Sequence, residues 1–319
     1  MSRLKLVCLF AMILCICQTS SVFAVAGIGI HYGFDMTLKM DNMPMEQTTF
    51  DNLKFGLDNF IQSQIPAGSG FMTTDLLTGK DIPVFIKRVD LKNPGINFGG
   101  KFYIDVIPVI DAIEVSTNFG VWQYDGAVIY PKSINFNTTQ TTGDPLRGWA
   151  HIDYDTMPIN FQTLDPSNSF WGMDKTPYAK LHLDATIRKY LLQIPPLVKM
   201  LKIYGGAGLS VDFATPMLSA KLIEDALGPT LNTQMNYSQL NTTLSDPTIM
   251  KKVLDEIINK MMTPHYGCNI DLGAMIKIPI MPVGFYLDAK YIILFDKLDK
   301  YVDIGGNGLL INIGAALAF

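Results

Sequence analysis

The sequence predicts an all-β protein: a transmembrane antiparallel up-and-down β-barrel of eight strands, with helical segments in its long loops. Three observations lead to this prediction. Hydrophobic residues make up 48% of the chain and charged residues 17%, yet beyond the N-terminus no run of 18 uncharged apolar residues could form a membrane-spanning helix. Long strand patterns with one apolar and one polar face recur along the chain. Short turns alternate with long loops between these patterns.

The N-terminal segment has the features of a secretory signal peptide. Arg3 and Lys5 precede an apolar stretch over residues 6–17, and small residues follow that stretch. This order of positive charge, apolar core and small residues directs secretion, and the segment is then removed. We expect cleavage after Ala24, with Ala26 as a second candidate.

The signal peptide then covers residues 1–24, and we expect residues 25–319 to form a single barrel domain. Cleavage removes two of the 25 basic residues and none of the 29 acidic ones, so the formal net charge falls from −4 to −6. A negative balance of this kind disfavours nucleic-acid binding. Cys268 is the one cysteine of the mature chain, which excludes an intramolecular disulfide.

The first strand pattern begins directly after the predicted cleavage site. Over residues 27–40, one face carries apolar residues such as Ile28 and Phe34, and the other carries His31 and Asp35. Successive residues of a strand point to opposite faces, and roughly 9–11 residues suffice for a tilted strand to cross a bilayer. Patterns of this kind predict eight strands, near residues 26–40, 95–107, 112–125, 178–191, 200–214, 266–279, 283–295 and 307–319.

The connections between these strands give the barrel a direction. The three short turns contain proline, which has no N–H to donate and therefore suits the end of a ladder. Short turns and both termini fall on one side of the barrel, and the long loops fall on the other. A closed barrel of this kind pairs every backbone group without an apolar helix. The long loops are residues 41–94, 126–177 and 215–265, with a shorter one at 296–306.

Two alternatives stay open at this point. A secreted soluble β-sandwich also has two-faced strands, although its strands are usually shorter and more numerous. The segments 82–91 and 127–136 carry strand patterns of their own. They would raise the strand count to ten and widen the lumen.

The C-terminal segment carries a resemblance to a known class. Its last residue is Phe319, and apolar residues stand at alternate positions before it, from Leu309 to Leu317. In this respect the chain resembles bacterial outer-membrane β-barrel proteins, whose last strand is recognised by the barrel-assembly machinery. Its strand count is similar to that of the small OmpA-like and OmpW-like barrels. The resemblance implies a bacterial outer-membrane location, with membrane lipid and the assembly machinery as partners.

The polar strand faces must line the interior if the apolar faces contact lipid. They carry seven cations and seven anions, which would most simply pair with one another, because an unpaired buried charge is costly. An ion-selective pore would instead show an excess of one sign. We therefore predict a lumen-lining charge network that includes the inward-facing His182. Its charged members are Asp35, Lys39, Lys101, Asp105, Glu114, Lys180, Asp184, Arg188, Lys202, Asp212, Asp271, Lys277, Asp288 and Lys290.

Three loop segments have helical patterning, at residues 48–62, 216–227 and 246–262. The last of them has Asp246 as N-cap and Pro247 at the first helical position. Their apolar faces must be buried, and two arrangements achieve this. The helices either pack on one another as a cap over the barrel mouth or enclose an apolar ligand, since Met-rich surfaces adapt to varied partners. The candidate ligand face consists of Phe50, Leu53, Leu57, Met250, Leu254, Ile257 and Met261.

These features support two main functional hypotheses. The first is passage or binding of a small hydrophobic molecule at the outer membrane, with the loop helices capping the outer mouth. The second is a non-transporting surface protein, an anchor or adhesin that binds a partner through its loops. A lipid-modifying hydrolase is a less favoured third hypothesis, because the histidines and serines form no paired motif. We predict no catalytic residue, cofactor or metal site, and we expect a monomer.

The C-terminal residue gives the first testable prediction. Deletion of Phe319 should impair membrane assembly, because it removes the aromatic end of the assembly signal. Substitution of the inward-facing Ala318 with Ser should have a much smaller effect. The amount of heat-modifiable barrel in isolated outer membranes measures both variants. Equal assembly of the two variants would contradict the role given to Phe319.

Overall fold

The computed structural model describes most of residues 25–319. The predicted signal peptide and Phe319 lie outside the described residues, so both stay predictions. The described residues are 26–38, 45–48, 84–105, 110–136, 150–159, 175–194, 200–231, 246–261, 263–278, 281–299, 302 and 304–318.

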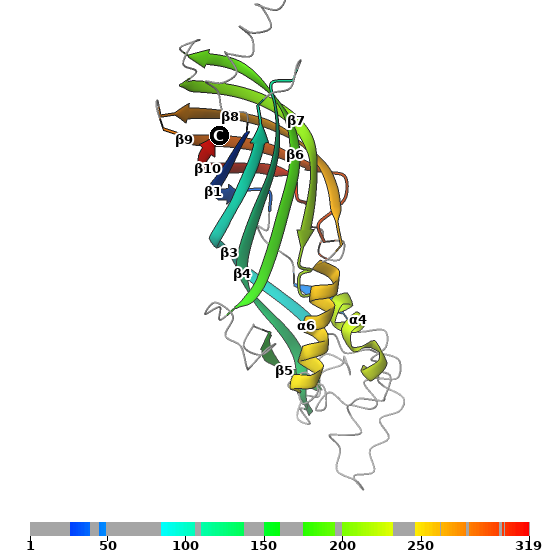
Figure 1. Ribbon diagram of the computed structural model, residues 1–319. Helices are drawn as coiled ribbons and strands as arrows, with labels where there is room; N and C mark the ends of the chain where they lie inside the picture. The colour runs from blue at the N-terminus through cyan, green and yellow to red at the C-terminus, as the bar shows by residue number, and fades with distance from the viewer. Residues whose placement is uncertain are drawn as a thin grey trace, which may run out of the picture.

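Eight strands form a closed antiparallel barrel (Figure 1). Each strand pairs with its two neighbours in an up-and-down order, and the last strand returns to pair with the first, for example at Tyr32 and Ile313. The predicted eight-strand barrel is therefore confirmed. Its strands are β1 (Ala26–Asp35), β3 (Val84–Ile104), β4 (Ala112–Phe136), β6 (Thr176–Ile194), β7 (Leu201–Ala214), β8 (His265–Lys277), β9 (Val283–Leu294) and β10 (Gly308–Ala318).

The barrel carries its apolar side chains outward and its charged side chains inward. On β9, outward-facing Phe285 and Leu287 are 56% and 49% exposed, whereas inward-facing Asp288 and Lys290 are buried. The same alternation runs along β8, with Leu272 outward and Asp271 inward. This is the inverse of a water-soluble barrel, and it follows from the period-two pattern of the sequence.

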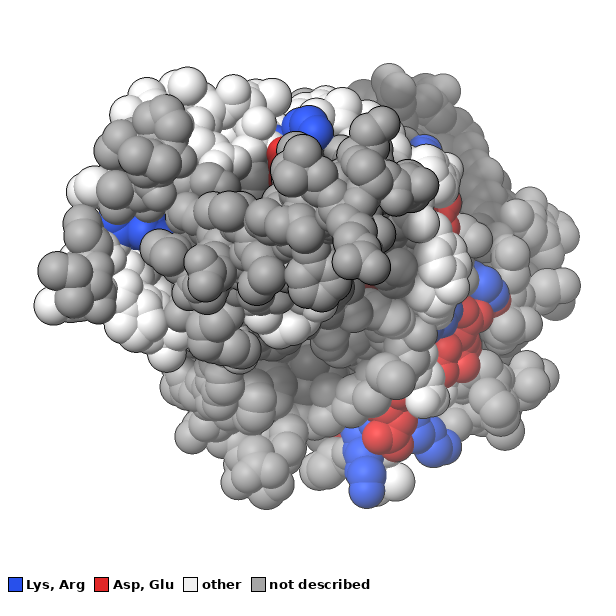
Figure 2. Space-filling model, turned by 45° about the horizontal axis from the view of Figure 1, so that its top comes forward, with Lys and Arg blue, Asp and Glu red and all other residues white. Residues whose placement is uncertain are grey.

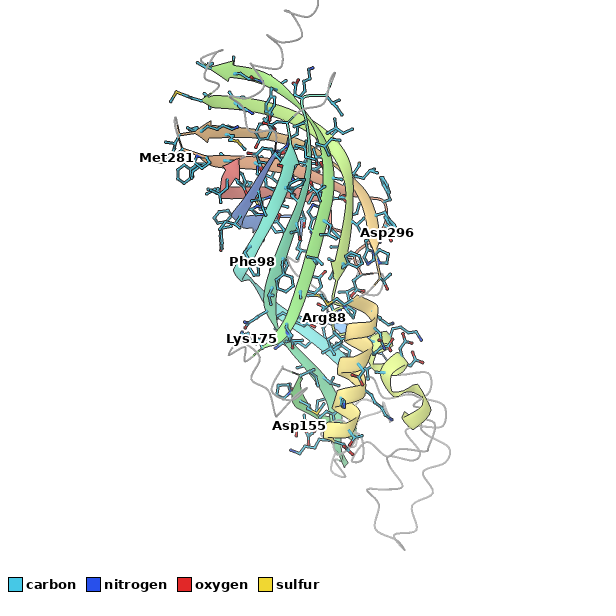
Figure 3. The ribbon with its side chains drawn as sticks, in the orientation of Figure 1. Arg88, Phe98, Asp155, Lys175, Met281 and Asp296 are labelled. Carbon is cyan, nitrogen blue, oxygen red and sulfur yellow. The ribbon has the colours of Figure 1, made fainter. Side chains whose placement is uncertain are left out.

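Short turns and long loops lie at opposite ends of the barrel, as predicted. In Figure 3, Met281 marks the short turn before β9, and Asp296 marks the long-loop end after it. We call the two ends the short-turn end and the long-loop end.

Strands β3 and β4 continue far beyond the barrel at the long-loop end. They pair with each other from Phe85 and Ile129 through to Ile104 and Ile113, with irregular register near Lys92. Beyond the rim, β2 (Glu46–Thr48) joins β3, and β5 (Ala150–Ile159) joins β4. We call this four-stranded part the extension.

The extension corrects the ten-strand alternative. The strand patterns within 82–91 and 127–136 lengthen β3 and β4 instead of adding strands to the ring, so the lumen stays that of an eight-strand barrel. The extension also places strands within the segments 41–94 and 126–177, which the sequence predicts as loops. Alternating apolar residues favour these strands, because inward-facing Ile86 and Val128 are buried.

Two helices cover the inner face of the extension (Figure 1). They are α4 (Ala220–Leu231) and α6 (Pro247–Met261), near the positions predicted for them. Ser219 caps α4 by accepting a hydrogen bond from the Leu222 amide at 3.1 Å, and Asp246 caps α6 through the Thr248 amide at 2.8 Å. The predicted helix at 48–62 lies outside the described residues. Neither α4 nor α6, the two described helices, is long and apolar enough to cross a bilayer.

Close approach of β1, β3 and β4 depends on Gly99. A Cβ atom at this position would lie 1.9 Å from the carbonyl oxygen of Thr117 and 2.4 Å from Nε2 of His31. No side chain fits without movement of the backbone or of the buried imidazole.

We therefore predict that Gly99→Ala destabilises the barrel by about 1–3 kcal/mol, the usual cost of overpacking. Gly305→Ala is the matched control, because a Cβ atom there would meet nothing within 4 Å. Urea unfolding of both variants in detergent, followed by loss of the heat-modifiable band, measures the difference. Equal unfolding midpoints would refute the close approach at Gly99.

Candidate functional site: the lumen and its cap

Two features fill the barrel and cover its long-loop end. The first is a set of polar side chains inside the barrel, which we call the lumen network. The second is the layer formed by α4, α6 and the preceding residues 217–219 over the long-loop end, which we call the cap. Both are buried.

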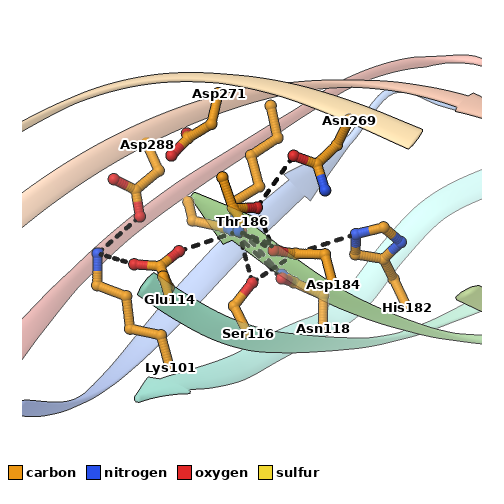
Figure 4. A network of polar contacts seen from close by, with 12 residues as sticks. Lys101, Glu114, Ser116, Asn118, His182, Asp184, Thr186, Asn269, Asp271 and Asp288 are labelled. Atoms are coloured by element: carbon orange, nitrogen blue, oxygen red, sulfur yellow. Dashed lines mark hydrogen bonds and ion pairs between the residues drawn. The ribbon is translucent and has the colours of Figure 1, made fainter. Parts of the chain in front are cut away.

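The centre of the lumen network is the side chain of Lys290, which is fully buried. Its Nζ atom lies 2.7 Å from Asp184, 3.1 Å from Glu114 and 2.6 Å from the Ser116 hydroxyl. The Ser116 hydroxyl donates to Asp184 at 2.5 Å. These groups come from β4, β6 and β9, so the contacts tie together opposite walls of the barrel (Figure 4).

Arg188 and Lys101 surround the same carboxylate, that of Glu114. Arg188 donates to Glu114 at 2.7 Å and to Asp271 at 2.8 Å. Lys101 lies 3.3 Å from Glu114 and 2.8 Å from Asp288. Each cation therefore contacts more than one carboxylate, which is the arrangement that makes buried ions tolerable.

Tyrosine rings line the network on the side of the short-turn end. The Nζ atom of Lys101 stands 3.2 Å from the ring centroid of Tyr286, and the guanidinium of Arg188 stands 4.1 Å from that of Tyr204. Both arrangements are cation–π contacts. The Tyr204 hydroxyl also donates to Asp288. These tyrosines form a buried aromatic cluster with Tyr103.

A separate ion pair lies beside this cluster. Lys202 donates to Asp105 at 2.6 Å, and the Tyr190 hydroxyl donates to the same carboxylate at 2.5 Å. Lys202 also stands 4.3 Å from the ring centroid of Tyr190. The short-turn end of the lumen is thus closed by paired charges and rings.

A second charged group lies nearer the long-loop end. Lys180 contacts Asp35 at 3.2 Å and Asp212 at 3.0 Å. The imidazole of His182 lies between two carboxylates, 3.2 Å from Asp184 on one side and hydrogen-bonded to Asp212 on the other. His182 therefore connects this group to the one around Lys290.

Uncharged polar side chains fill the space between these groups and the wall at β1. His31 contacts the Asn118 side chain at 3.0 Å and the Tyr286 hydroxyl at 2.9 Å. Asn118 donates to Asn312 at 2.8 Å. All four side chains are buried, as expected for an eight-strand barrel, whose interior is just wide enough to be filled by side chains.

The structure brings together most of the residues predicted for the lumen. Lys39 lies outside the described residues, and Lys277 stands at the short-turn end of β8, away from the central contacts. The described central groups are five cations and seven carboxylates, with His182 between two of the latter. The five cations are Lys101, Lys180, Arg188, Lys202 and Lys290.

The cap is held over the barrel mouth by a strap, residues 217–219, that runs between β7 and α4. Its backbone amides donate to side chains at the barrel mouth: that of Met217 to Asp299, in the loop after β9, at 2.8 Å, and that of Leu218 to the Tyr124 hydroxyl of β4 at 2.9 Å. The carbonyl of Leu218 accepts from Arg88 at 2.6 Å. Figure 3 labels Arg88 on the extension, near its base.

Glu46 on β2 links the strap to the extension. It accepts a hydrogen bond from Arg88 at 2.8 Å and another from the backbone amide of Ala220 at 3.2 Å. The carboxylate also stands at the N-terminus of α4, where the helix dipole favours negative charge. Sequence reasoning missed this cluster, because its members are distant along the chain and none lies in a motif.

An apolar core joins the cap to the barrel mouth. Leu222 and Ile223 of α4 and Val253 of α6 are buried. The cluster continues through Trp122 of β4 to Leu310 of β10 inside the mouth. Trp122 and Tyr178 meet edge to face, with ring centroids 6.0 Å apart.

The two helices are also joined by ion pairs on their outer side. Asp225 of α4 accepts from Lys260 of α6 at 2.6 Å and contacts Lys221 at 2.9 Å. Partial burial acts to raise the pKa of Asp225, but the hydrogen bonds and charges of the two lysines outweigh it and lower that pKa. The carboxylate therefore stays ionised to a lower pH than an unperturbed aspartate would.

The structure locates only part of the predicted ligand face. Ile257 packs against the apolar core, and Met261 is half-buried at the end of α6. Phe50, Leu53 and Leu57 lie outside the described residues, as do the side chains of Met250 and Leu254. In the described part, apolar residues of the helices pack against the extension and the barrel mouth.

These contacts define the chemistry of the interior. Every cation of the described lumen network contacts a carboxylate and every carboxylate contacts a cation, and the cap covers the long-loop end. No group of three or more His, Cys, Asp or Glu side chains within the described ranges is placed to hold a metal ion. Cys268 is a half-buried free thiol on β8.

We predict that Lys290→Met lowers the unfolding free energy by about 3–5 kcal/mol, because loss of one buried partner leaves the carboxylates of Glu114 and Asp184 without their shared cation. Lys221→Met removes the same charge from a side chain that is 49% exposed, and it should cost less than about 1 kcal/mol. Denaturant unfolding of the two variants in the same detergent compares them. A Lys290 variant as stable as the Lys221 variant would show that the network contributes nothing.

Comparison of the chain with protein-family models, with curated proteins and with solved structures gives no match, so the fold and the contacts above are what inform its function.

Proposed function

We propose that the protein is a non-transporting anchor of the bacterial outer membrane, with its barrel in the lipid and its cap and extension on the outer side for partner binding. The observation that carries the proposal is the inverted distribution of side chains, with apolar residues outward and the charges inward. A closed barrel with this distribution meets the demand of a bilayer that every backbone group be paired.

The height of the outward apolar surface fits a bilayer. On β9 the outward-facing residues run from Phe285 to Phe295, and those within the strand are uncharged. Ten residues at about 3.3 Å each, tilted by about 40°, rise roughly 25 Å, which is the height of the apolar band of outer-membrane barrels. In the view of Figure 2, most of the described surface is uncharged, and charged side chains stand in a few separate places, chiefly toward the right and the bottom.

The anchor role follows from what fills the barrel. Paired charges around Glu114 and Lys290 occupy its centre, and the strap and Trp122 occupy its long-loop end. A path through the lumen would require these contacts to separate. The described residues outside the barrel instead form a packed unit, and such a unit offers a partner a fixed surface. The proposed role is not enzymatic, and the protein acts as a monomer.

Passage or binding of a small hydrophobic molecule is the second candidate. It is favoured by the apolar core, which runs without interruption from the cap helices at Ile223 and Val253 to Ile292 inside the mouth. An apolar molecule that entered between the helices and the extension would meet a continuous apolar surface.

An outward-facing substitution tests the membrane location. Leu272→Arg at the middle of β8 should lower stability by about 2–4 kcal/mol in a bilayer, because it places a charge against lipid. Asn259→Arg, on the exposed side of α6, is the control and should change stability by less than about 0.5 kcal/mol. Folding yield into phosphatidylcholine vesicles and urea unfolding measure both. A Leu272 variant that folds as well as the control would argue for a soluble protein.

Conductance separates the two candidate roles. Wild-type protein in a planar phosphatidylcholine bilayer should give no current steps, and mass spectrometry of the purified protein should reveal no bound apolar molecule. Replacement of residues 216–263 by a short linker, which keeps β7 and β8 complete, should leave the barrel folded and heat-modifiable but abolish surface binding of a partner. Channel steps or a co-purifying apolar ligand in the wild type would favour the second candidate.

A further inference from the structure

A pocket lies where β4 changes its neighbour. Tyr124 of β4 pairs with Thr176 of β6, whereas Gly126 pairs with Ile159 of β5. The end of β5 and the start of β6 therefore meet on the same edge of β4. The break in the ladder leaves a pocket of about 150 Å³, with walls that include Lys87, Val89, Asp125, Thr156, Pro158 and Lys175.

The walls of this pocket carry a surplus of positive charge. Lys175 donates to Asp125 at 2.7 Å, so these two charges neutralise each other. Lys87 is exposed, and no carboxylate of the described residues lies within ion-pair distance of it. One ammonium group is thus left to bind an external anion, with the Thr156 side chain on another wall. Val89 and Pro158 add an apolar part.

The pocket lies beyond the apolar outer surface of the barrel. Asp125 stands four residues past Val121, which lies on the same face of β4 and is buried, and Lys175 stands four residues before the half-buried Ala179. Four residues correspond to about 13 Å along a strand and to roughly 10 Å in height at the usual tilt. The polar layer of a bilayer is about 5–8 Å deep on each side, and a lysine side chain extends into it from above.

We propose that this pocket binds the anionic group of a membrane-lipid headgroup, a phosphate or carboxylate, with Lys87 as the principal cation and Lys175 as the second. The proposal rests on the membrane location proposed above. The volume of the pocket equals that of about five water molecules, which is enough for one such group and too small for a whole lipid. The bound headgroup would fix the depth and rotation of the barrel at the base of the extension.

The test measures lipid binding by native mass spectrometry of the detergent-purified protein. Phosphatidylglycerol is titrated against phosphatidylcholine, with Lys87→Gln and Lys175→Gln as the variants. Lys132→Gln is the matched control, since Lys132 is 66% exposed on the extension, is paired with Asp155 and does not line the pocket. Each variant must first show the heat-modifiable band of the folded barrel.

We expect Lys87→Gln to bind phosphatidylglycerol about fivefold more weakly, which corresponds to ~1 kcal/mol for one lysine near an anionic surface. Lys175→Gln should weaken phosphatidylglycerol binding at least as much, because Asp125 is then free to pair with Lys87. The control should stay within about twofold of wild type, a difference of less than ~0.5 kcal/mol. Equal weakening in the control, or no change in Lys87→Gln, would overturn the proposal.

Two further measurements complete the test. One identifies the source of the anion, and the other tests the membrane location on which the proposal rests. Inorganic phosphate is added in competition, and full displacement of phosphatidylglycerol at equal concentration would assign the pocket to a soluble anion instead of a lipid. Insertion of wild-type protein into neutral phosphatidylcholine nanodiscs reports on the membrane location alone. Failure of that insertion would refute the anchor proposal, whereas the binding comparison in detergent would still decide the pocket.

Discussion

Every charge inside the barrel has to find an opposite charge inside the barrel, and the rest of the structure depends on this constraint. The strands turn their apolar faces outward, so the only place for Glu114, Lys290 and their neighbours is an interior with little room for water. The solution is a set of shared contacts in which Lys101, Arg188 and Lys290 each touch at least two carboxylates. Because these contacts join β3, β4, β6, β8 and β9, the network also fixes which walls face each other.

The same constraint explains where glycines and tyrosines stand along the inner wall. The inward positions of β1 carry little volume at Gly27 and Gly33, and the space is taken by Tyr103 and by the side chains of Asn118 and Asn312 from other strands. Large rings near the short-turn end then place their faces against Lys101 and Arg188. Volume and charge are therefore matched across the lumen, and a methyl group at a position such as Gly99 disturbs both.

The cap is held in a different way. It has an apolar core, and a few local hydrogen bonds fix its strap in place. Arg88, Tyr124 and Asp299 bind backbone groups of the strap, and these groups would otherwise be buried without partners. The extension provides the sheet against which α4 and α6 pack, so the unit above the barrel has a core of its own. On the outer side of that extension, the change of neighbour along β4 opens the pocket lined by Lys87 and Lys175.

The sequence by itself determined the eight strands, their facing and the direction of the barrel, because the period-two pattern is local and strong enough to be read residue by residue. It also placed the charged residues on the inner faces, and it located the helix of α6 through Asp246 and Pro247. Only the tertiary structure decided which charges pair, that residues 84–91 and 127–136 extend existing strands, and that Arg88 and Glu46 hold the strap. These outcomes depend on the register between strands and on contacts between distant segments, which a local pattern does not encode.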